Sequence, residues 1–495
     1  MDYRIVIGLE VHVQLLTRTK LFCGCSTKFG LPPNSATCPV CIGMPGVLPV
    51  MNRQAFELAL KAALALNCQI TRFTKWDRKN YYYPDLPKNY QISQYDLPFS
   101  KDGWLEIETL SPEGRGEGVR GKRVGLIRVH LEEDAGKMLH DESGGGKESL
   151  VDLNRTGTPL LEIVSKPEIS SPEEAKAYLE EIRLLLRELE VSDCEMQEGS
   201  LRCDANVNVH IPQTDGTVAA TPIVEVKNLN SFRAVERAMK YEAQRQFEEF
   251  QRIGKKLGEA PKATAGWDEA CGVTVVQRRK EEAEDYRYFP EPDLVPVVLD
   301  DAWLARVREN VGQLPAAQRQ RIQEQYRLSA YDAGVITSQG RAFVRYFEEA
   351  TRLSGDANES KNWTTNEVLQ ELNERKQAIG EFGVTATALA DLIKEVRSAG
   401  LNKQLAREVF AEMLASGHPA KEAVAKLGIK VVADESQLVE IVRRAIAANP
   451  KAVADYKKGK VKAADAIKGA VMRETKGMAK MELVQPLVLA ELEKA

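Results

Sequence analysis

The sequence predicts an α+β fold, in which a mainly antiparallel β domain precedes an all-α region. Two observations predict this fold. Residues 1–294 alternate short β-branched segments with Gly, Pro and Asn turns, a pattern typical of antiparallel strands. After Pro296 the composition changes to Ala, Glu, Lys, Arg and Leu, which favour helices. The chain has 495 residues, enough for about three domains.

Three predicted strands each place polar side chains on one face. Alternate residues of a strand share a face, so a period of two separates polar from apolar positions. The polar positions are Glu10, His12 and Gln14 in residues 8–15, Arg128, His130 and Glu132 in 127–132, and Asp204, Asn206, Asn208 and His210 in 204–211. The residues between them, including Ile127, are expected to form an apolar backing face.

A fourth predicted strand, residues 160–164, carries one carboxylate, Glu162, among apolar side chains. An ionised carboxylate in such a strand is costly unless a cation lies beside it or water reaches it. Glu162 is therefore either another metal ligand or the partner of Arg155 or Lys166 in a salt bridge.

Carboxylates, amides and imidazoles on one sheet surface are the ligands required by a hard divalent cation that carries nucleotide phosphates. A solvated face is the alternative, because any antiparallel sheet with one wet side shows the same alternation. Surface strands usually carry Thr, Lys and Ser, whereas three of the five histidines lie on these strands. The residues alone leave both interpretations open, and the first indicates phosphate chemistry.

Four cysteines form two close pairs, Cys23 with Cys25 and Cys38 with Cys41. Such spacing predicts a tetrahedral thiolate cage for zinc, which would be structural because all four positions are filled by protein. Metal-free thiols in a Gly/Pro-rich loop are the alternative. The other cysteines are expected to be small buried apolar side chains; they are Cys68, Cys194, Cys203 and Cys271.

Two helices of the first part have clear starts. Ser171 is followed by Pro172, Glu173 and Glu174, a capping box with proline at the first helical position. A second amphipathic pattern begins at Ser231.

Two other segments indicate nucleic-acid contact. Residues 77–88 combine Arg78, Lys79 and Lys88 with three tyrosines and two prolines, so that rings could stack on a base while cations meet phosphates; a rigid structural loop is the alternative. Residues 443–480 contain eleven Lys or Arg against three Asp or Glu. This basic segment could contact a phosphate backbone or could simply be a solvated helix.

Several classes are disfavoured. No apolar run approaches the ~20 residues that span a bilayer, and the start lacks the pattern of a signal peptide. We therefore expect a cytoplasmic protein without membrane contact. The sequence contains no Walker-type phosphate loop and no Ser-His-Asp or amidase-like Ser-Lys signature, so a nitrogen-releasing hydrolase would have to be a partner.

Six segments make the chain resemble a known family, the B subunits of the tRNA-dependent amidotransferases (the GatB family). They are IGLEVHV (7–13), HLEEDAGK (130–137), VDLNR (151–155), GSLRCDAN (199–206), VKNLNS (226–231) and DYRYFP (285–290). The resemblance covers nearly the whole chain. It implies a cradle-like catalytic domain over residues 1–294, a helical domain over 295–412 and a basic helical tail domain over 413–495 that contacts the tRNA body.

The resemblance also implies a reaction. A ligase of this family uses ATP and Mg²⁺ to phosphorylate the side-chain carboxylate of Glu-tRNA(Gln) or Asp-tRNA(Asn). Ammonia from glutamine then displaces phosphate and gives Gln-tRNA(Gln) or Asn-tRNA(Asn). The expected partners in a heterotrimer are an amidase (glutaminase), the A subunit, which releases the ammonia, and a small bridging protein, the C subunit.

Positions carried over from the family give the candidate site. Glu10, His12, Glu132 and Glu162 match its Mg²⁺-binding and catalytic residues, and the four cysteines match a zinc site found in part of the family. Lys79, Arg202 or Lys227 could hold phosphates, with Lys79 also a catalytic candidate. Asp204, Asn206 and Asn228 are candidates for a second cation or the ribose.

Two other classes of function fit the same residues. A zinc-stabilised, tRNA-binding scaffold would have acidic faces that are merely solvated. A synthetase-like enzyme would activate a free amino acid and exchange ATP with pyrophosphate without any aminoacyl-tRNA.

Overall fold

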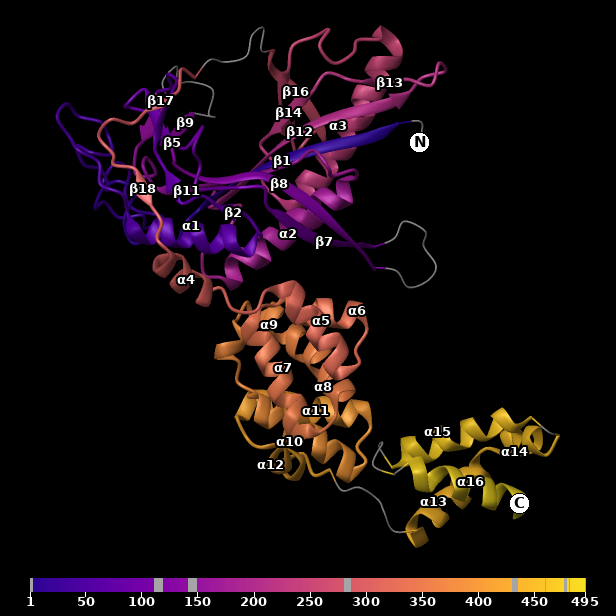
Figure 1. The fold of residues 1–495 in the computed structure, drawn as a ribbon. Helices are drawn as coiled ribbons and strands as arrows, with labels where there is room; N and C mark the ends of the chain where they lie inside the picture. The colour runs from indigo at the N-terminus through magenta and orange to yellow at the C-terminus, as the bar shows by residue number, and fades with distance from the viewer. Residues whose placement is uncertain are drawn as a thin grey trace. The chain divides into compact units, whose positions relative to one another are not determined.

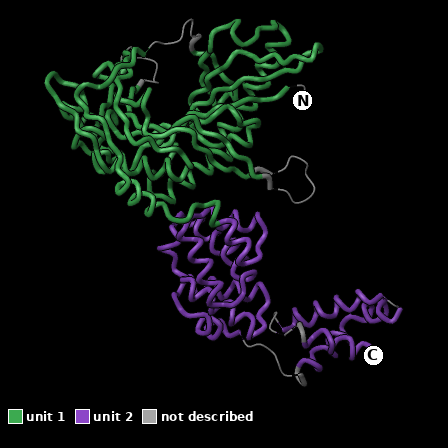
Figure 2. The backbone as a smooth tube through the Cα atoms, viewed as in Figure 1, with its two compact units in different colours: residues 1–318 green, residues 319–495 purple. Residues whose placement is uncertain are grey.

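The computed structural model describes residues 3–110, 119–140, 149–279, 286–429, 435–458, 460–475, 479 and 481–494. The chain divides into two compact units, residues 1–318 and 319–495 (Figure 2). The first unit contains the β-sheets and the second consists, in its described part, mainly of helices (Figure 1). The predicted α+β class is confirmed.

One large sheet organises the first unit. Its strands pair antiparallel, apart from the parallel pair β14 and β15. Its order is β16 (Val273–Arg279), β15 (Ala263–Asp268), β14 (Val224–Lys227), β12 (Leu201–Pro212), β1 (Arg4–Gln14), β11 (Pro159–Ser165), β8 (Val119–Glu133), β6 (Ser100–Lys101) and β2 (Gln69–Ile70). In addition, β13 (Val218–Ala220) pairs with β12 and β7 (Trp104–Leu110) pairs with β8.

Three smaller sheets accompany it. Their strands are β17 (Phe289–Pro290), β4 (Asp77–Asn80) and β5 (Tyr90–Ser93) in the first, β10 (Ser149–Asp152) and β9 (Lys137–His140) in the second, and β18 (Val297–Val298) and β3 (Phe73–Thr74) in the third. The pairing of β17 with β4 matters for the site, because it brings residues near 289 beside residues 77–80.

The central strands bury one face. Leu9, Val11 and Val13 of β1 are completely buried, as the two-residue period predicts. They share one apolar core with helices α1 (Arg53–Ala65), α2 (Pro172–Glu188) and α3 (Phe232–Ile253). Figure 1 shows α1 and α2 along one side of these strands. The opposite face is left for the polar side chains.

The prediction for Ile127 is wrong, because this side chain is 47% exposed. Val164 of β11 pairs with Arg128 but the next residue, Ser165, pairs with Leu126, so Ile127 is skipped at a register shift. A bulge of this kind interrupts the alternation of faces. Beyond it, Val129 and Leu131 are buried as expected.

Both predicted helix starts are confirmed. The Ser171 side chain accepts a hydrogen bond from the Glu174 backbone N–H at 3.1 Å and caps α2. The Glu174 carboxylate accepts from the Ser170 N–H rather than from that of Ser171, so the box closes one residue earlier than its usual form. Ser231 caps α3 through the N–H of Ala234.

The first compact unit continues past residue 294. Helix α4 (Asp301–Glu309) packs on α1, and its Val307 belongs to the core of the first unit. The following helices are α5 (Pro315–Tyr326), α6 (Ala330–Ser338), α7 (Arg341–Ser354), α8 (Ala357–Asn362), the π-helix η1 (Trp363–Val368), α9 (Leu369–Arg375), the 3₁₀ helix η2 (Ile379–Glu381), α10 (Ala386–Ala399), α11 (Lys403–Ser416), α12 (Ala420–Lys426), α13 (Glu435–Ala448), α14 (Pro450–Lys457), the 3₁₀ helix η3 (Val461–Ala463), α15 (Ala464–Glu474) and α16 (Met481–Lys494).

Two separate apolar cores occur among these helices, one with buried residues between Ile322 and Ala423 and one between Leu438 and Leu492. The predicted division of this region into helical and tail domains stays a prediction. Among the helices that are described, none is both long and apolar enough to cross a membrane.

Candidate active site and metal centre

Strand register brings the polar side chains of four strands into rows. His12 of β1 lies opposite Glu162 of β11 on one side and opposite Arg202 of β12 on the other. Glu162 in turn lies opposite His130 of β8. Directly opposed residues have Cβ atoms about 5 Å apart, so the side chains of this row lie within contact distance of their neighbours.

Three of these side chains converge. Ligand atoms of His12, Glu132 and Glu162 lie within 4.8 Å of one another, and we call this set the carboxylate–histidine cluster. The Glu162 Oε2 lies 3.7 Å from His12 Nε2 and 3.2 Å from His130 Nε2. Glu132 and Glu162 are both buried. Sequence period and strand register together therefore create a compact acidic site.

Glu162 is ionised although it is buried. Burial disfavours the carboxylate, but the charges of His130, His12 and Lys79 outweigh it and hold the Glu162 pKa well below its usual value. Burial likewise opposes the charge of Lys79, and Glu132 and Glu162 overcome this and raise its pKa. Lys79 Nζ lies 4.0 Å from Glu132 Oε2. Cations and carboxylates in this cluster maintain one another's charge.

Glu10 lies on the same face, one step along β1. It pairs with Asp204 and Val164, and its carboxylate accepts a hydrogen bond from the Asn206 side-chain amide at 2.9 Å. Glu10 does not belong to the set of described residues whose ligand atoms lie within 4.8 Å of one another. Glu10 is therefore a neighbour of the carboxylate–histidine cluster rather than a member.

Asp134 holds together one edge of the polar face, and sequence reasoning gave it no role. It accepts hydrogen bonds from Arg202 and from Gln14, each at 2.8 Å, and lies 3.6 Å from Arg155 Nε. Burial raises the Asp134 pKa, but the two arginines hold it below its usual value. Its position in the HLEEDAGK segment could have indicated that Asp134 belongs to the site. Arg155 therefore pairs with Asp134, and Glu162 pairs with histidines instead of with Arg155 or Lys166.

The other residues predicted to contact the nucleotide lie in different places. Lys227 Nζ lies 2.8 Å from Asp204 and 3.1 Å from Glu225, and these carboxylates raise its pKa against the opposing effect of burial. Asn228 is exposed and adopts a left-handed backbone (φ 63°). It lines a cavity together with Gly266. Asp204 and Lys227 therefore lie together on the polar face, and the Asn228 amide lies beside Gly266, the β15 residue that pairs with Lys227.

Arg128 is a second residue to which sequence reasoning gave no role. It lies on β8 opposite Val164, in the row that also contains Glu10. Its Nε is buried without a hydrogen-bond partner, and no ion pair within the described residues includes Arg128. Arg128 shares the two-residue period of His130 and Glu132, and this pattern could have indicated that it belongs to the site. By contrast, Lys79, Arg202 and Lys227 each already contact a carboxylate.

An aromatic group stands beside Lys79. Its Nζ lies 5.2 Å from the centre of the Tyr286 ring, within range of a cation–π contact. The Tyr286 ring lies 6.1 Å from that of Tyr81 and 6.0 Å from that of Tyr288, which stacks on Tyr95 at 4.0 Å. Burial raises the Tyr288 pKa to about 12.

The other cations of residues 77–88 have internal partners. Arg78 makes two 2.7 Å hydrogen bonds to Glu291, and Lys88 pairs with Glu133. Lys79 and Tyr81 are therefore the members of this segment that lie near the carboxylate–histidine cluster.

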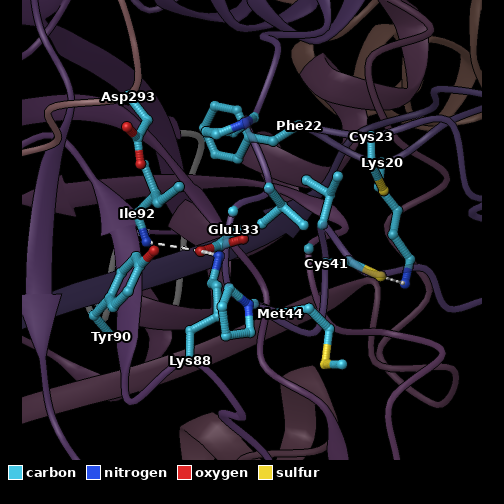
Figure 3. Close-up of a pocket in the computed structure, with 17 residues that line it drawn as sticks. Lys20, Phe22, Cys23, Cys41, Met44, Lys88, Tyr90, Ile92, Glu133 and Asp293 are labelled. Atoms are coloured by element: carbon cyan, nitrogen blue, oxygen red, sulfur yellow. Dashed lines mark hydrogen bonds and ion pairs between the residues drawn. The ribbon is translucent and has the colours of Figure 1, made fainter.

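The four cysteines gather as their spacing predicts. Cys23, Cys25, Cys38 and Cys41 place their sulfurs within 4.8 Å of one another, and we call them the four-cysteine cluster. A hydrogen bond from Cys23, together with Lys20, lowers the Cys41 pKa to about 4 despite burial. Figure 3 shows Lys20 pointing at Cys41. A cluster of four thiols at this spacing could bind a metal such as zinc.

Three of the isolated cysteines, Cys68, Cys194 and Cys203, are buried as expected. The prediction for Cys271 is wrong, because it is exposed. It lies in the turn between β15 and β16, where its backbone N–H donates to the Asp268 carboxylate.

Comparison with known proteins identifies relatives along the whole chain. Residues 5–305 match the GatB/GatE catalytic domain and residues 345–492 match the GatB domain. The aspartyl/glutamyl-tRNA(Asn/Gln) amidotransferase B subunit of Rhodopirellula baltica is 50% identical over 98% of this chain and 96% of its own length. The corresponding B subunits of Moorella thermoacetica and Carboxydothermus hydrogenoformans are 50% and 47% identical, with at least 99% of each chain covered.

Proposed function

This chain belongs to the GatB family of amidotransferase B subunits, and from that membership we propose that it converts Glu-tRNA(Gln) or Asp-tRNA(Asn) to the amidated aminoacyl-tRNA in an ATP-dependent reaction. The observation that carries the proposal is the carboxylate–histidine cluster, with ligand atoms of His12, Glu132 and Glu162 within 4.8 Å. A scaffold with merely solvated acidic faces would not need two buried carboxylates packed against a lysine and two histidines.

The donor set fits a hard divalent cation. Two buried carboxylates and an imidazole converge, and Glu10 offers a third carboxylate in the neighbouring row. We assign Glu10, His12, Glu132 and Glu162 as the residues that would hold Mg²⁺. When bound, Mg²⁺ offsets negative charge on nucleotide phosphates. Glu162 is ionised near neutral pH, so it serves as an anion and not as a proton donor.

Cations around the cluster would contact the nucleotide. Lys79 and Arg202 border the acidic side chains, and Asp204, Asn206 and Lys227 continue the face along β12 and β14. We propose that Arg128 joins them as a phosphate contact, since its guanidinium is not committed to a carboxylate. A planar guanidinium can donate two parallel hydrogen bonds to phosphate oxygens.

The reaction proceeds in two steps. In the first, an oxygen of the substrate side-chain carboxylate attacks the γ-phosphorus of ATP, which forms an acyl phosphate and releases ADP. In the second, ammonia attacks the carbonyl carbon and phosphate leaves. The acyl phosphate is labile to water, which is a physical reason for a site with buried walls and delivered ammonia.

The A subunit, a glutaminase, would supply the ammonia, and the small C subunit would complete the heterotrimer. The absence of a hydrolase signature from the sequence supports a separate source of ammonia. The basic residues of 443–480 would contact the tRNA body. We assign zinc to the four-cysteine cluster, where a closed set of four thiolates gives a structural role.

The decisive experiment compares wild type with Glu10→Gln and Glu132→Gln in the complex with its partner proteins, supplied with Glu-tRNA(Gln), Mg²⁺, glutamine and ATP. Both variants are expected to lose Gln-tRNA formation by about a hundredfold or more, while the partner's glutaminase activity persists. Glu106→Gln, an exposed carboxylate of β7, is the matched control and should be unaffected.

Undiminished product in both variants would leave a tRNA-binding scaffold. ATP–pyrophosphate exchange with a free amino acid and no tRNA would instead favour the synthetase-like function.

A further inference from the structure

Lys20 is completely buried and lies beside the four-cysteine cluster. Its ammonium is 2.8 Å from the Ala36 carbonyl, 3.4 Å from the Leu153 carbonyl and 3.5 Å from Cys41 Sγ. Removing an ammonium from water costs several kcal/mol unless a negative charge lies close to it. Two neutral carbonyls satisfy its hydrogen bonds but do not supply that charge.

Three partly buried cations of the first unit do have carboxylate partners. The pairs are Lys88 with Glu133, Arg202 with Asp134 and Arg78 with Glu291. Within the described part of the chain, no carboxylate lies within ion-pair distance of Lys20, and Cys41 is the ionisable group that it contacts. The charge that compensates Lys20 must therefore come from sulfur.

The surroundings of Cys41 fit a metal-bound thiolate. Its sulfur faces two N–H donors, Lys20 Nζ at 3.5 Å and the Cys38 backbone N–H at 3.2 Å. A neutral thiol would instead donate to the Cys38 carbonyl at 3.4 Å and would leave the ammonium uncompensated. Four thiolates around a divalent ion carry two net negative charges, of which one ammonium balances one.

We propose that Lys20 is the counter-cation of the metal centre in the four-cysteine cluster and slows release of the metal by holding its positive charge beside the Cys41 thiolate. This inference rests on the metal centre proposed above. Partners of this kind, outside the ligands themselves, commonly change metal affinity 10–100-fold.

The same side chain ties the cluster to the polar face. The Leu153 carbonyl that accepts from Lys20 belongs to a loop in which Asn154 accepts from the Ala36 N–H at 2.8 Å. The next residue, Arg155, donates to the Ala135 carbonyl at 2.9 Å and lies beside Asp134. Lys20 is thus a positioning residue, because it contacts this loop and not the reacting groups.

The experiment measures metal content and metal release in the full-length chain within its complex. Wild type, Lys20→Met and Lys20→Gln are loaded with zinc and exposed to excess chelator, and zinc release is followed over time. Wild type should hold one zinc per chain. Both variants should release it at least about tenfold faster, the Gln variant included, since Gln can donate hydrogen bonds but carries no charge.

Lys61→Met is the matched control, because the Lys61 ammonium also donates to a backbone carbonyl, that of Leu189. It should release zinc at the wild-type rate. If wild type neither contains nor takes up zinc, the metal centre itself is refuted. If wild type holds zinc and Lys20→Gln releases it at the same rate, the centre stands and the role of Lys20 is overturned. Should Lys20→Met fail to fold, Lys20→Gln alone decides.

Discussion

The described residues of the first unit form two candidate metal sites that are built in opposite ways. The carboxylate–histidine cluster stands on β1, β8 and β11, where strand register fixes each side chain. The four-cysteine cluster lies within residues 22–46, outside the strands of the sheets. Hard oxygen and imidazole ligands with neighbouring cations meet in the first, and soft thiolates meet in the second.

This difference indicates that the carboxylate–histidine cluster serves the reaction and that the four-cysteine cluster serves the structure. Side chains on strands are held by the sheet with or without an ion, so the first site can leave coordination positions for a substrate. The cysteine loop is held by turns and not by a strand ladder, and four thiolates around a metal would close the loop on itself. We therefore expect loss of metal at the cysteines to affect stability and changes on the polar face to affect turnover.

Removing the proposed zinc site gives the largest expected effect on stability. Cys25→Ser should lower the free energy of unfolding of the first unit by ~3 kcal/mol, the amount gained when a metal is present at about a hundredfold its Kd. Gln-tRNA formation should be retained at a temperature at which the variant stays folded. Urea titration with tryptophan fluorescence measures the first quantity, and an aminoacylation assay measures the second.

Cys271→Ser is the control for this comparison, since Cys271 is exposed and outside the cluster. It should change neither quantity. Loss of turnover in fully folded Cys25→Ser would break the distinction, because it would give the cysteine loop a part in the chemistry.

A smaller effect is expected from Arg128→Gln. If Arg128 contacts a phosphate, the KM for ATP should rise roughly tenfold, about 1.4 kcal/mol of lost binding. Stability should hardly change, because Arg128 has no described ion pair to lose. Arg123→Gln is the matched control, an exposed arginine of the same strand. Equal KM values for both variants would remove Arg128 from the nucleotide site.

The polar face could be predicted from sequence because strand alternation is local. Glu10 and His12 of one strand, and His130 and Glu132 of another, alternate with apolar residues. The skipped residue Ile127 could not be predicted, since a bulge depends on how β8 meets β11.

Contacts between residues far apart in the sequence could not be predicted either. Asp134 meets Arg202 across 68 positions of the chain, and the burial of Lys20 follows from loops that pack around it. A pattern of single residues carries no information about such contacts.

The smallest expected effect is a pH dependence of stability that arises from Glu162. Its folded-state pKa lies well below the usual 4.5, so the ionised form stabilises the fold above that value. This contribution is lost as pH falls below 4.5 through the folded-state pKa. The difference in free energy of unfolding between wild type and Glu162→Gln should thus be constant from about pH 7 to pH 5.5 and shrink below pH 4.5.

Urea unfolding at a series of pH values measures this difference, with Glu106→Gln as an exposed control. A difference that already disappears near pH 6 would mean that Glu162 takes up a proton near neutrality, as a buried carboxyl without cationic partners does. The carboxylate–histidine cluster would then not keep its negative charge by itself. We infer that the four-cysteine cluster needs both a metal and Lys20, so the two clusters would no longer differ in this respect.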